Sequence, residues 1–339
     1  MTRPPPASGG SAFEVFRVFL RLGLVSFGGP IAHLGYFHRE FVQRRGWLDE
    51  ARYAQLLAPC QFLPGPASSQ FGFSVGLLRA GWAGGVAAFI GFTLPSALLL
   101  LAFAHYGAAL GGAYGHAILH GLKLVAVAVV AQGVLAMARQ LAPDWPRRAI
   151  ALAAMGAVLV LPMAGTQLAV IAAGAAMGLL VCRSLSPAAA AALPLRYGPR
   201  AGALLLCVLG MLLAASLAVP QGAPLPLRAA SALFRAGALV FGGGHVVLPL
   251  LKQALVVPGW LGEDEFLAGY GAAQAVPGPM FSVAAFLGAR LMGGEGGAAG
   301  ALLCLLSLFL PGLLLIAGVL PYWSQLAADT RVARAMAGV

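Results

Sequence analysis

Charge is the scarcest property of this 339-residue chain: Asp, Glu, Lys and Arg together make up 9% of it, against roughly 25% in an average soluble domain. Three runs, 149–182, 201–227 and 296–328, contain no charged residue at all. The mean hydropathy is +0.88. Because about 20 apolar residues are needed to cross the hydrocarbon core, this shortage of charge excludes a soluble globular protein and predicts an all-α polytopic membrane protein.

Acidic residues are fewer than basic ones, 10 against 21, and the net charge is +11. The basic residues are spread through short loops, as the positive-inside bias produces. No basic cluster or motif suggests a nucleic-acid partner. Residues 1–12 lack the apolar core of a signal peptide and are expected to be a disordered lead-in.

Motifs for enzymatic or metal chemistry are also missing. The chain has no nucleophile elbow, P-loop or HExxH sequence, and its six histidines show no repeated metal-ligand spacing. We therefore expect no cofactor, no metal and no catalytic residue. No CxxC pair occurs, and the cysteines lie singly in apolar runs, where they are expected to be buried packing residues: Cys60, Cys182, Cys207 and Cys304.

What the chain does contain is a long internal repeat. Phe27-Gly28-Gly29 is followed by Gln61-Phe62-Leu63-Pro64-Gly65-Pro66, and both motifs recur in the same order as Phe241-Gly242-Gly243 and Gln274-Ala275-Val276-Pro277-Gly278-Pro279. The offsets agree closely (241 − 27 = 214; 277 − 64 = 213). A repeat of this length, with helix breakers at fixed places, indicates a duplicated structural unit. Further matched pairs extend it: Arg21 and Arg235, Gly46-Trp47-Leu48 and Gly259-Trp260-Leu261, Glu50 and Glu263, Ser69 and Ser282, Pro95 and Pro311.

The repeat divides the chain into a first unit, 13–183, a connector with one transmembrane helix, 184–228, and a second unit, 229–339. The second unit lacks a counterpart of 123–182, and we expect a truncation within a further helix. The charge-free run 149–182 is too long for one span, since 34 residues at 1.5 Å per residue exceed a core of ~30 Å. It is predicted to form two short helices.

Inverted repeats are the predicted architecture, of the kind that builds transporters. With a cytoplasmic amino terminus, most basic loops fall inside. The loop with Arg39, Arg44, Arg45 and Arg52 does not fit. It would move inside if segments 13–37 and 53–78 both re-entered the membrane instead of spanning it, and that alternative stays open.

The broken helices suggest an anion site. Gly-Gly and Pro-Gly-Pro inside apolar segments free backbone groups, which is tolerated where those groups face protein or water, and a half-helix N-terminus attracts an anion. Arg21 and Arg235 precede the breaks, and an arginine within the membrane usually marks a pathway or a partner. The predicted substrate-binding residues are Arg21, Gly28, Gly29, Gln61, Pro64, Gly65, Pro66, Ser69, Arg235, Gly242, Gly243, Gln274, Pro277, Gly278, Pro279 and Ser282, with Lys123 as a pathway candidate.

Each of these features has a structural alternative. Arg21 could extend to the lipid head groups, Gly-Gly could permit close helix packing, and Pro-Gly-Pro could only bend a helix. Glu50 and Glu263 are expected to be charges at helix starts rather than proton carriers, and Trp47 and Trp260 interface anchors rather than ligands. An intramembrane enzyme acting on a lipid phosphate is a second hypothesis, and a membrane scaffold without transport is a third.

The two sets of motifs, with Ser26 and Pro30 beside the first and Gly244-His245 and Pro249 beside the second, resemble the chromate ion transporter family in its two-domain form. The resemblance covers about residues 13–335. It implies a multi-pass inner-membrane protein that exports chromate from the cytoplasm and contributes to chromate resistance. A sulfate-like anion is the alternative substrate. The oligomeric state stays open, with a homodimer as one option.

Overall fold

Every regular element that the computed structural model describes is helical. The structure describes residues 9–107, 120–121, 124, 135, 144–160, 166–181, 193–241, 244–293 and 297–338. These fall into two compact units, one formed by 1–129 with 194–321 and the other by 130–193 with 322–339. The boundaries of the sequence repeat stay a prediction, because the larger unit combines helices from both copies.

The first copy begins with two broken helices. Its elements are α1 (Ala12–Val25), α2 (Gly29–His38), the π-helical η1 (Arg39–Arg44), α3 (Glu50–Phe62) and α4 (Ala67–Tyr106). The breaks fall at the predicted glycines and prolines: α1 ends at Ser26, and α3 ends before Pro64. Asp49 caps α3, since its carboxylate accepts from the Arg52 N–H at 2.7 Å.

Helix α4 is two helices joined at a sharp turn. Ala80 and Gly81 have non-helical backbone angles, and a Cβ on Gly76 would lie 2.3 Å from the Gly84 carbonyl oxygen. A contact between residues eight positions apart requires the chain to fold back. The second half of α4 therefore runs alongside the first, and α1 packs against α4.

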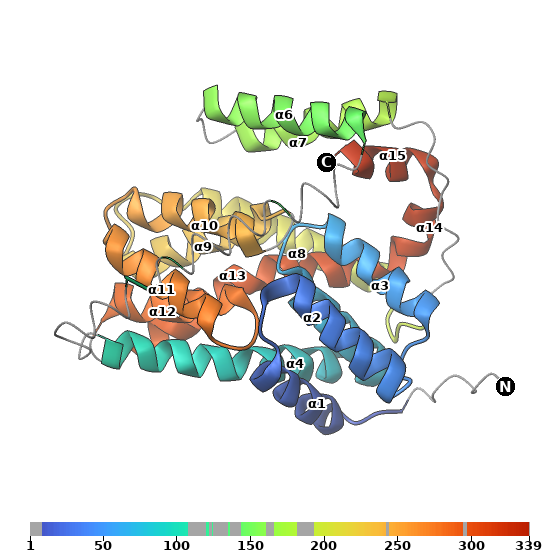
Figure 1. Ribbon diagram of the computed structural model, residues 1–339, viewed down its shortest axis with the longest axis horizontal. Helices are drawn as coiled ribbons and strands as arrows, with labels where there is room; N and C mark the ends of the chain where they lie inside the picture. The colour runs from blue at the N-terminus through green and yellow to red at the C-terminus, as the bar shows by residue number, and fades with distance from the viewer. Residues whose placement is uncertain are drawn as a thin grey trace. The chain divides into compact units, whose positions relative to one another are not determined.

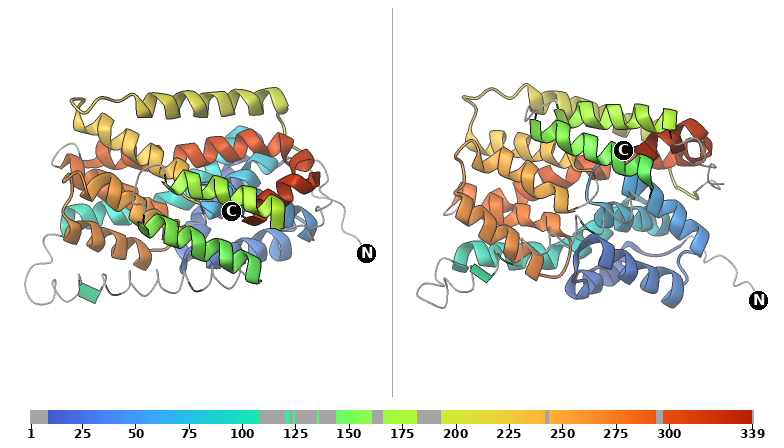
Figure 2. Two further views of the ribbon diagram at one scale, coloured as in Figure 1. Left: turned by 90° about the horizontal axis from the view of Figure 1, so that it is seen from above. Right: turned by 45° about the horizontal axis from the view of Figure 1, so that its top comes forward.

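The second copy repeats this plan with its elements separated. They are α9 (Leu225–Leu239), α10 (Gly244–Leu251), η3 (Lys252–Val256), α11 (Glu263–Ala275), η4 (Met280–Ser282), α12 (Val283–Met292) and α13 (Gly297–Val319), ending in η6 (Leu320–Tyr322). The connector forms α8 (Pro199–Leu217). In the larger unit, α13 packs against α8, α9 and α12 and also contacts α4 of the first copy. The helices of both copies can be followed in Figure 1 and in the two further views of Figure 2.

Equivalent close contacts recur in both copies. A Cβ on Gly23 of α1 would lie 2.7 Å from the Phe92 carbonyl oxygen of α4, and one on Gly237 of α9 would lie 2.1 Å from that of Leu308 in α13. Each copy therefore packs its first helix against its own long helix through a glycine.

The smaller unit contains α6 (Trp145–Val160), α7 (Thr166–Val181), α14 (Trp323–Ala328) and α15 (Thr330–Gly338). Helices α6 and α7 confirm the prediction that the charge-free run forms two helices.

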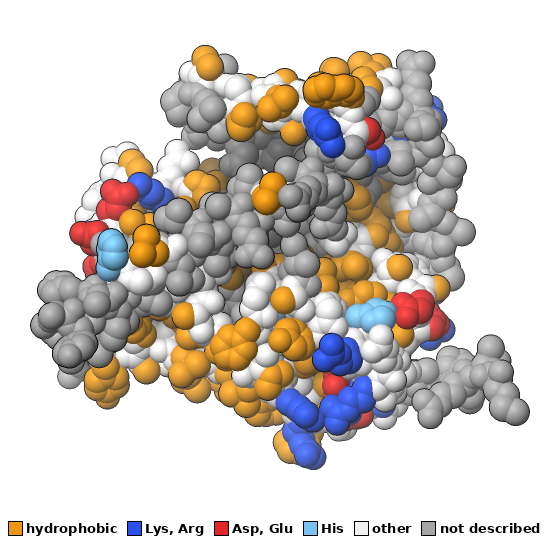
Figure 3. All heavy atoms as spheres, viewed as in Figure 1, with side chains coloured by type: hydrophobic (Ala, Val, Ile, Leu, Met, Phe, Trp, Pro, Cys, Tyr) orange, Lys and Arg blue, Asp and Glu red, His pale blue; other side chains and the backbone are white. Residues whose placement is uncertain are grey.

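Three helices in the described ranges are long and apolar enough to cross a membrane: Ala67–Tyr106, Pro199–Leu217 and Gly297–Ala328. Hydrophobic side chains cover the visible surface along α4 (Figure 3). Among the cysteines, Cys60 and Cys304 are buried as expected, whereas Cys207 is exposed on α8, so the expectation of burial was wrong there. Cys182 lies outside the described residues.

Candidate functional site: the crossing of the broken helices

The Pro-Gly-Pro loop of each copy reaches the Gly-Gly break of the other. The Gly65 N–H donates to the Val240 carbonyl at 2.7 Å, and the Gly278 N–H donates to the Ser26 carbonyl at 2.9 Å. Ser26 and Val240 directly precede the two Phe-Gly-Gly motifs. The two bonds are therefore reciprocal, and we call the region that they join the crossing.

Glycine is required in both loops by conformation and by space. Gly65 has φ +128° and Gly278 has φ +105°, values that side chains rarely adopt. A Cβ on Gly65 would lie 2.9 Å from the Gly312 Cα, and one on Gly278 would lie 2.8 Å from the Ser96 Oγ. Because Gly312 and Ser96 each follow the proline of a long helix, each loop packs against the same point of the other copy.

Side-chain hydrogen bonds hold the crossing at two points. The Gln70 Nε2 donates to the carbonyls of Pro64, at 2.9 Å, and Gly312, at 3.0 Å. The Ser96 Oγ and the Ser282 Oγ lie 2.7 Å apart and share a hydrogen bond. Both contacts join the first copy to the second, so side chains as well as backbone connect the two breaks.

The predicted site residues divide into those at the crossing and those away from it. Pro66, Ser69, Pro277, Pro279 and Ser282 are buried there with the two glycines, and Pro64 is half-buried. Gly28 and Gly29 begin α2 with φ +94° and +77°. Gln61 is exposed, whereas the Gln274 Nε2 approaches the Met280 Sδ. Gly242, Gly243 and Lys123 lie outside the described residues.

The two arginines have different surroundings. Arg21 is exposed on α1 and has no hydrogen bond or ion pair in the part of the chain that the structure describes. Arg235 is half-buried and donates to the Ser216 carbonyl at the end of α8, where a cation also meets the negative end of the helix dipole. That both guanidinium groups bind an anion stays a prediction.

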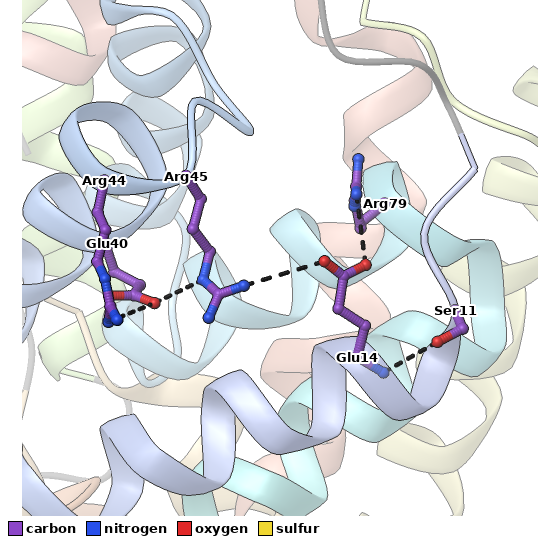
Figure 4. Close-up of polar contacts among 6 residues, drawn as sticks. All are labelled: Ser11, Glu14, Glu40, Arg44, Arg45 and Arg79. Carbon is purple, nitrogen blue, oxygen red and sulfur yellow. Dashed lines mark hydrogen bonds and ion pairs between the residues drawn. The ribbon is translucent and has the colours of Figure 1, made fainter.

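The far ends of the first copy's broken helices meet in a network of charges (Figure 4). Glu14, near the start of α1, lies 3.9 Å from the Arg45 guanidinium and 3.3 Å from that of Arg79. Arg45 also pairs with Glu40 at 2.6 Å. Both arginines lie over the Trp47 ring, with centroid distances of 5.3 and 5.0 Å. Each broken helix therefore forms a hairpin that begins and ends on one side, with its break at the opposite end.

The second copy joins equivalent ends with other residues. The Arg228 guanidinium lies 4.7 Å from the centre of the Trp260 ring, joining the start of α9 to the turn after η3. Arg290 pairs with Glu265, joining the end of α12 to the start of α11. Trp47 and Trp260 thus anchor helix ends, and Trp47 is buried rather than lipid-facing.

Three buried polar residues near the crossing were missed by the sequence reasoning: His33, Gln70 and Thr93. That reasoning selected polar residues that occur in both copies, and these occur in one. Their counterparts are Val247, Val283 and Phe309, so a comparison of the copies for polar residues replaced by apolar ones would have found them.

The family model described as "Chromate transporter" matches residues 13–179 and 227–339. A chromate transport protein of Pseudomonas aeruginosa is 30% identical over 91% of this chain and 72% of its own length. One of Cupriavidus metallidurans is 26% identical over 92% of this chain and 75% of its own length. No solved structure gives a significant match.

Proposed function

Because the chain belongs to the chromate transporter family, we propose that it is an inner-membrane protein that exports chromate from the cytoplasm by alternating access. The observation that carries the structural part of this proposal is the reciprocal pair of bonds at the crossing. Broken helices from two repeats that meet within the membrane form the substrate sites of many secondary transporters.

The hairpin geometry favours re-entrant segments over spanning ones. Arg45 and Arg79 share Glu14, so the basic loop at 39–52 lies at the same end of the helices as Arg79. The positive-inside bias places that end in the cytoplasm. The loop that conflicts with a simple spanning topology then lies on the cytoplasmic side, as the positive-inside bias requires.

An inverted arrangement follows from this topology. If the hairpins of the first copy enter from the cytoplasm, those of the second enter from the periplasm, and their breaks meet between the two faces. Rocking of one copy against the other would open the crossing to each side in turn. The two reciprocal hydrogen bonds are the contacts that such a motion has to break and remake.

The crossing suits an oxyanion because its breaks free backbone donors. The α2 helix starts at the Gly28-Gly29 break with Pro30 in its first turn, and its positive end attracts negative charge. Arg21 is exposed about two helical turns before this break, where it would draw an anion toward the crossing. Arg235 would do so from the second copy if it released the Ser216 carbonyl.

Chromate uptake into inverted membrane vesicles tests the proposal. Vesicles that contain the protein are expected to accumulate chromate when energised, whereas vesicles with the Gly65→Ala variant are not, because the loop can no longer reach Val240. Western blotting and a Gly210→Ala variant, altered on α8 where nothing lies within 4 Å, control for expression. Uptake by the protein no greater than that of empty vesicles would reject the proposal.

A further inference from the structure

Buried polar atoms without a hydrogen-bond partner gather in the first copy. Among the described residues they include the Ser26 Oγ, His33 Nδ1, Ser69 Oγ, Gln70 Oε1 and Thr93 Oγ1. Each of these five residues is at most 3% exposed. A buried polar atom without a partner is destabilising, and a group of such atoms suggests that a ligand satisfies them.

The five residues lie around the crossing. The Ser26 carbonyl accepts from the His33 Nε2 at 3.2 Å and from the Gly278 N–H at 2.9 Å. The His33 ring packs edge-on against Phe92, the neighbour of Thr93, with centroids 5.3 Å apart. Phe37 connects the two halves of α4.

The Phe37 ring centre lies 5.2 Å from that of Phe92 and 5.8 Å from that of Phe71, which follows Ser69 and Gln70. The first half of α4 carries Ser69 and Gln70, and the second half, which folds back along it, carries Thr93. All five residues therefore belong to the first copy, at its first break, on α2 and on the two packed halves of α4.

The second copy lacks four of these five polar residues. The counterparts of Ser26, His33, Gln70 and Thr93 are apolar and fully buried: Val240, Val247, Val283 and Phe309. Ser69 alone has a polar counterpart, Ser282, whose hydroxyl is occupied by Ser96. The second copy fills with methyl groups and a ring the positions that the first copy leaves polar.

We propose that the transporter has one ligand site, in the first copy, and that this site takes a tetrahedral oxyanion carrying one proton. The inference rests on the proposed function and adds the protonation state of the substrate. It also makes sulfate a poor ligand.

The hydrogen-bonding capacity of the five atoms sets the ligand. The Ser26 carbonyl can only accept, so the His33 Nε2 carries its hydrogen and Nδ1 of the neutral ring is an acceptor. Both hydrogens of the Gln70 amide point to carbonyls, so Oε1 is an acceptor as well. The three hydroxyls can rotate to donate. The site therefore offers donors for an anion and two acceptors for a proton.

A fully ionised oxyanion has only hydrogen-bond acceptors. One of its oxygens would face the lone pair of Gln70 Oε1 or His33 Nδ1, and the two acceptors would repel each other. A singly protonated one donates its O–H there and accepts from the hydroxyls. Chromate takes up its first proton close to neutral pH, whereas sulfate does so only in strong acid. A single negative charge is also cheaper to remove from water than two.

The charged groups on the elements around His33 are engaged elsewhere or exposed. On α2 itself, His38 pairs with Glu50 of α3 at 2.9 Å. On η1, Glu40 forms ion pairs with Arg44 and Arg45. On α4, Arg79 forms an ion pair with Glu14 of α1. Arg17 and Arg21 of α1 and Arg39 of η1 are exposed; beyond the Gly278 loop, Arg290 pairs with Glu265 and Lys252 with Glu263. We therefore attribute the pH dependence of binding to the proton that the ligand carries and donates to His33 or Gln70.

Equilibrium binding of radioactive chromate to the purified full-length protein in nanodiscs tests the inference. Above the pH at which free chromate is half protonated, the Kd for total chromate is expected to rise about tenfold per pH unit. Sulfate in large excess should not displace it. A Kd that does not change with pH, or sulfate competing as well as chromate, would overturn the proposal.

Variants place the site in the first copy. Ser69→Ala and the isosteric Thr93→Val should each weaken chromate binding about tenfold. Ser231→Ala removes a buried hydroxyl from α9 of the second copy, where it donates to the Leu227 carbonyl at 2.8 Å, and should leave binding unchanged. Thermal unfolding checks that all three variants fold. Weakening by Ser231→Ala equal to that by Ser69→Ala would contradict a one-sided site. Absence of both binding and uptake by the unaltered protein would overturn the proposed function itself, and this inference with it.

Discussion

Replacing Gly278 with alanine tests how much the crossing contributes to stability. The residue has φ +105°, and its new Cβ would lie 2.8 Å from the Ser96 Oγ and 3.1 Å from the Ser96 Cβ. Backbone strain of this kind costs about 1–3 kcal/mol. Moving the loop away from Ser96 would in addition lose the bond to Ser26, which is worth about 1 kcal/mol.

Gly259 is the matched control. It has φ +75° with nothing within 4 Å of an added Cβ, so alanine there introduces strain without a clash. We expect Gly278→Ala to lower the free energy of unfolding by about 2 kcal/mol more than Gly259→Ala, the sum of the lost bond and the crowding. Denaturant titration in mixed micelles measures both. A loss at Gly278 no larger than that at Gly259 would refute the reasoning.

Two further predictions concern charged residues. Arg235→Ala removes the donor to the Ser216 carbonyl and should lower the unfolding free energy by about 1 kcal/mol, whereas Arg21→Ala should leave stability unchanged in the same titration; equal losses would contradict the different surroundings of the two arginines. Burial alone would raise the pKa of Glu40, but hydrogen bonds from Arg45 and Arg44 hold it below its usual value. This stabilisation is present above the unfolded-state pKa and is lost as the pH falls through the folded-state pKa. Glu40→Gln should therefore reduce the fall in unfolding free energy at acidic pH. An unchanged fall at acidic pH would count against the pairing.

The main features of the fold could be predicted from the sequence because they depend on backbone constraints. The Gly-Gly and Pro-Gly-Pro motifs fall at the breaks between helices in both copies, and their recurrence at 214 and 213 residues indicated two copies with equivalent breaks. The run of apolar residues at 149–182 was similarly decided by length alone. These are local or periodic properties that one sequence displays.

The side chains of the site could not be predicted in the same way. Arg21 lies on the exposed side of α1, and the buried Phe19 and Gly23 lie on the opposite side. The orientation of α1 in the packed protein decides this exposure, and the recurrence of the arginine in the second copy does not reveal it. His33 becomes significant only through its hydrogen bond to the Ser26 carbonyl, and Gln70 only through its hydrogen bond to the Gly312 carbonyl across the crossing. The choice between spanning and re-entrant segments depended on Arg45 meeting Glu14, a contact between distant parts of the chain.

Reversible cross-linking of the crossing tests the central claim most directly. In a protein whose native cysteines are replaced, Ser96→Cys and Ser282→Cys put two thiols where hydroxyl oxygens now lie 2.7 Å apart. The account predicts that mild oxidation joins them, that chromate uptake into inverted vesicles then falls to background, and that reduction restores it. Failure to cross-link, or full uptake by the cross-linked protein, would contradict a transporter that works by separating its two broken-helix repeats.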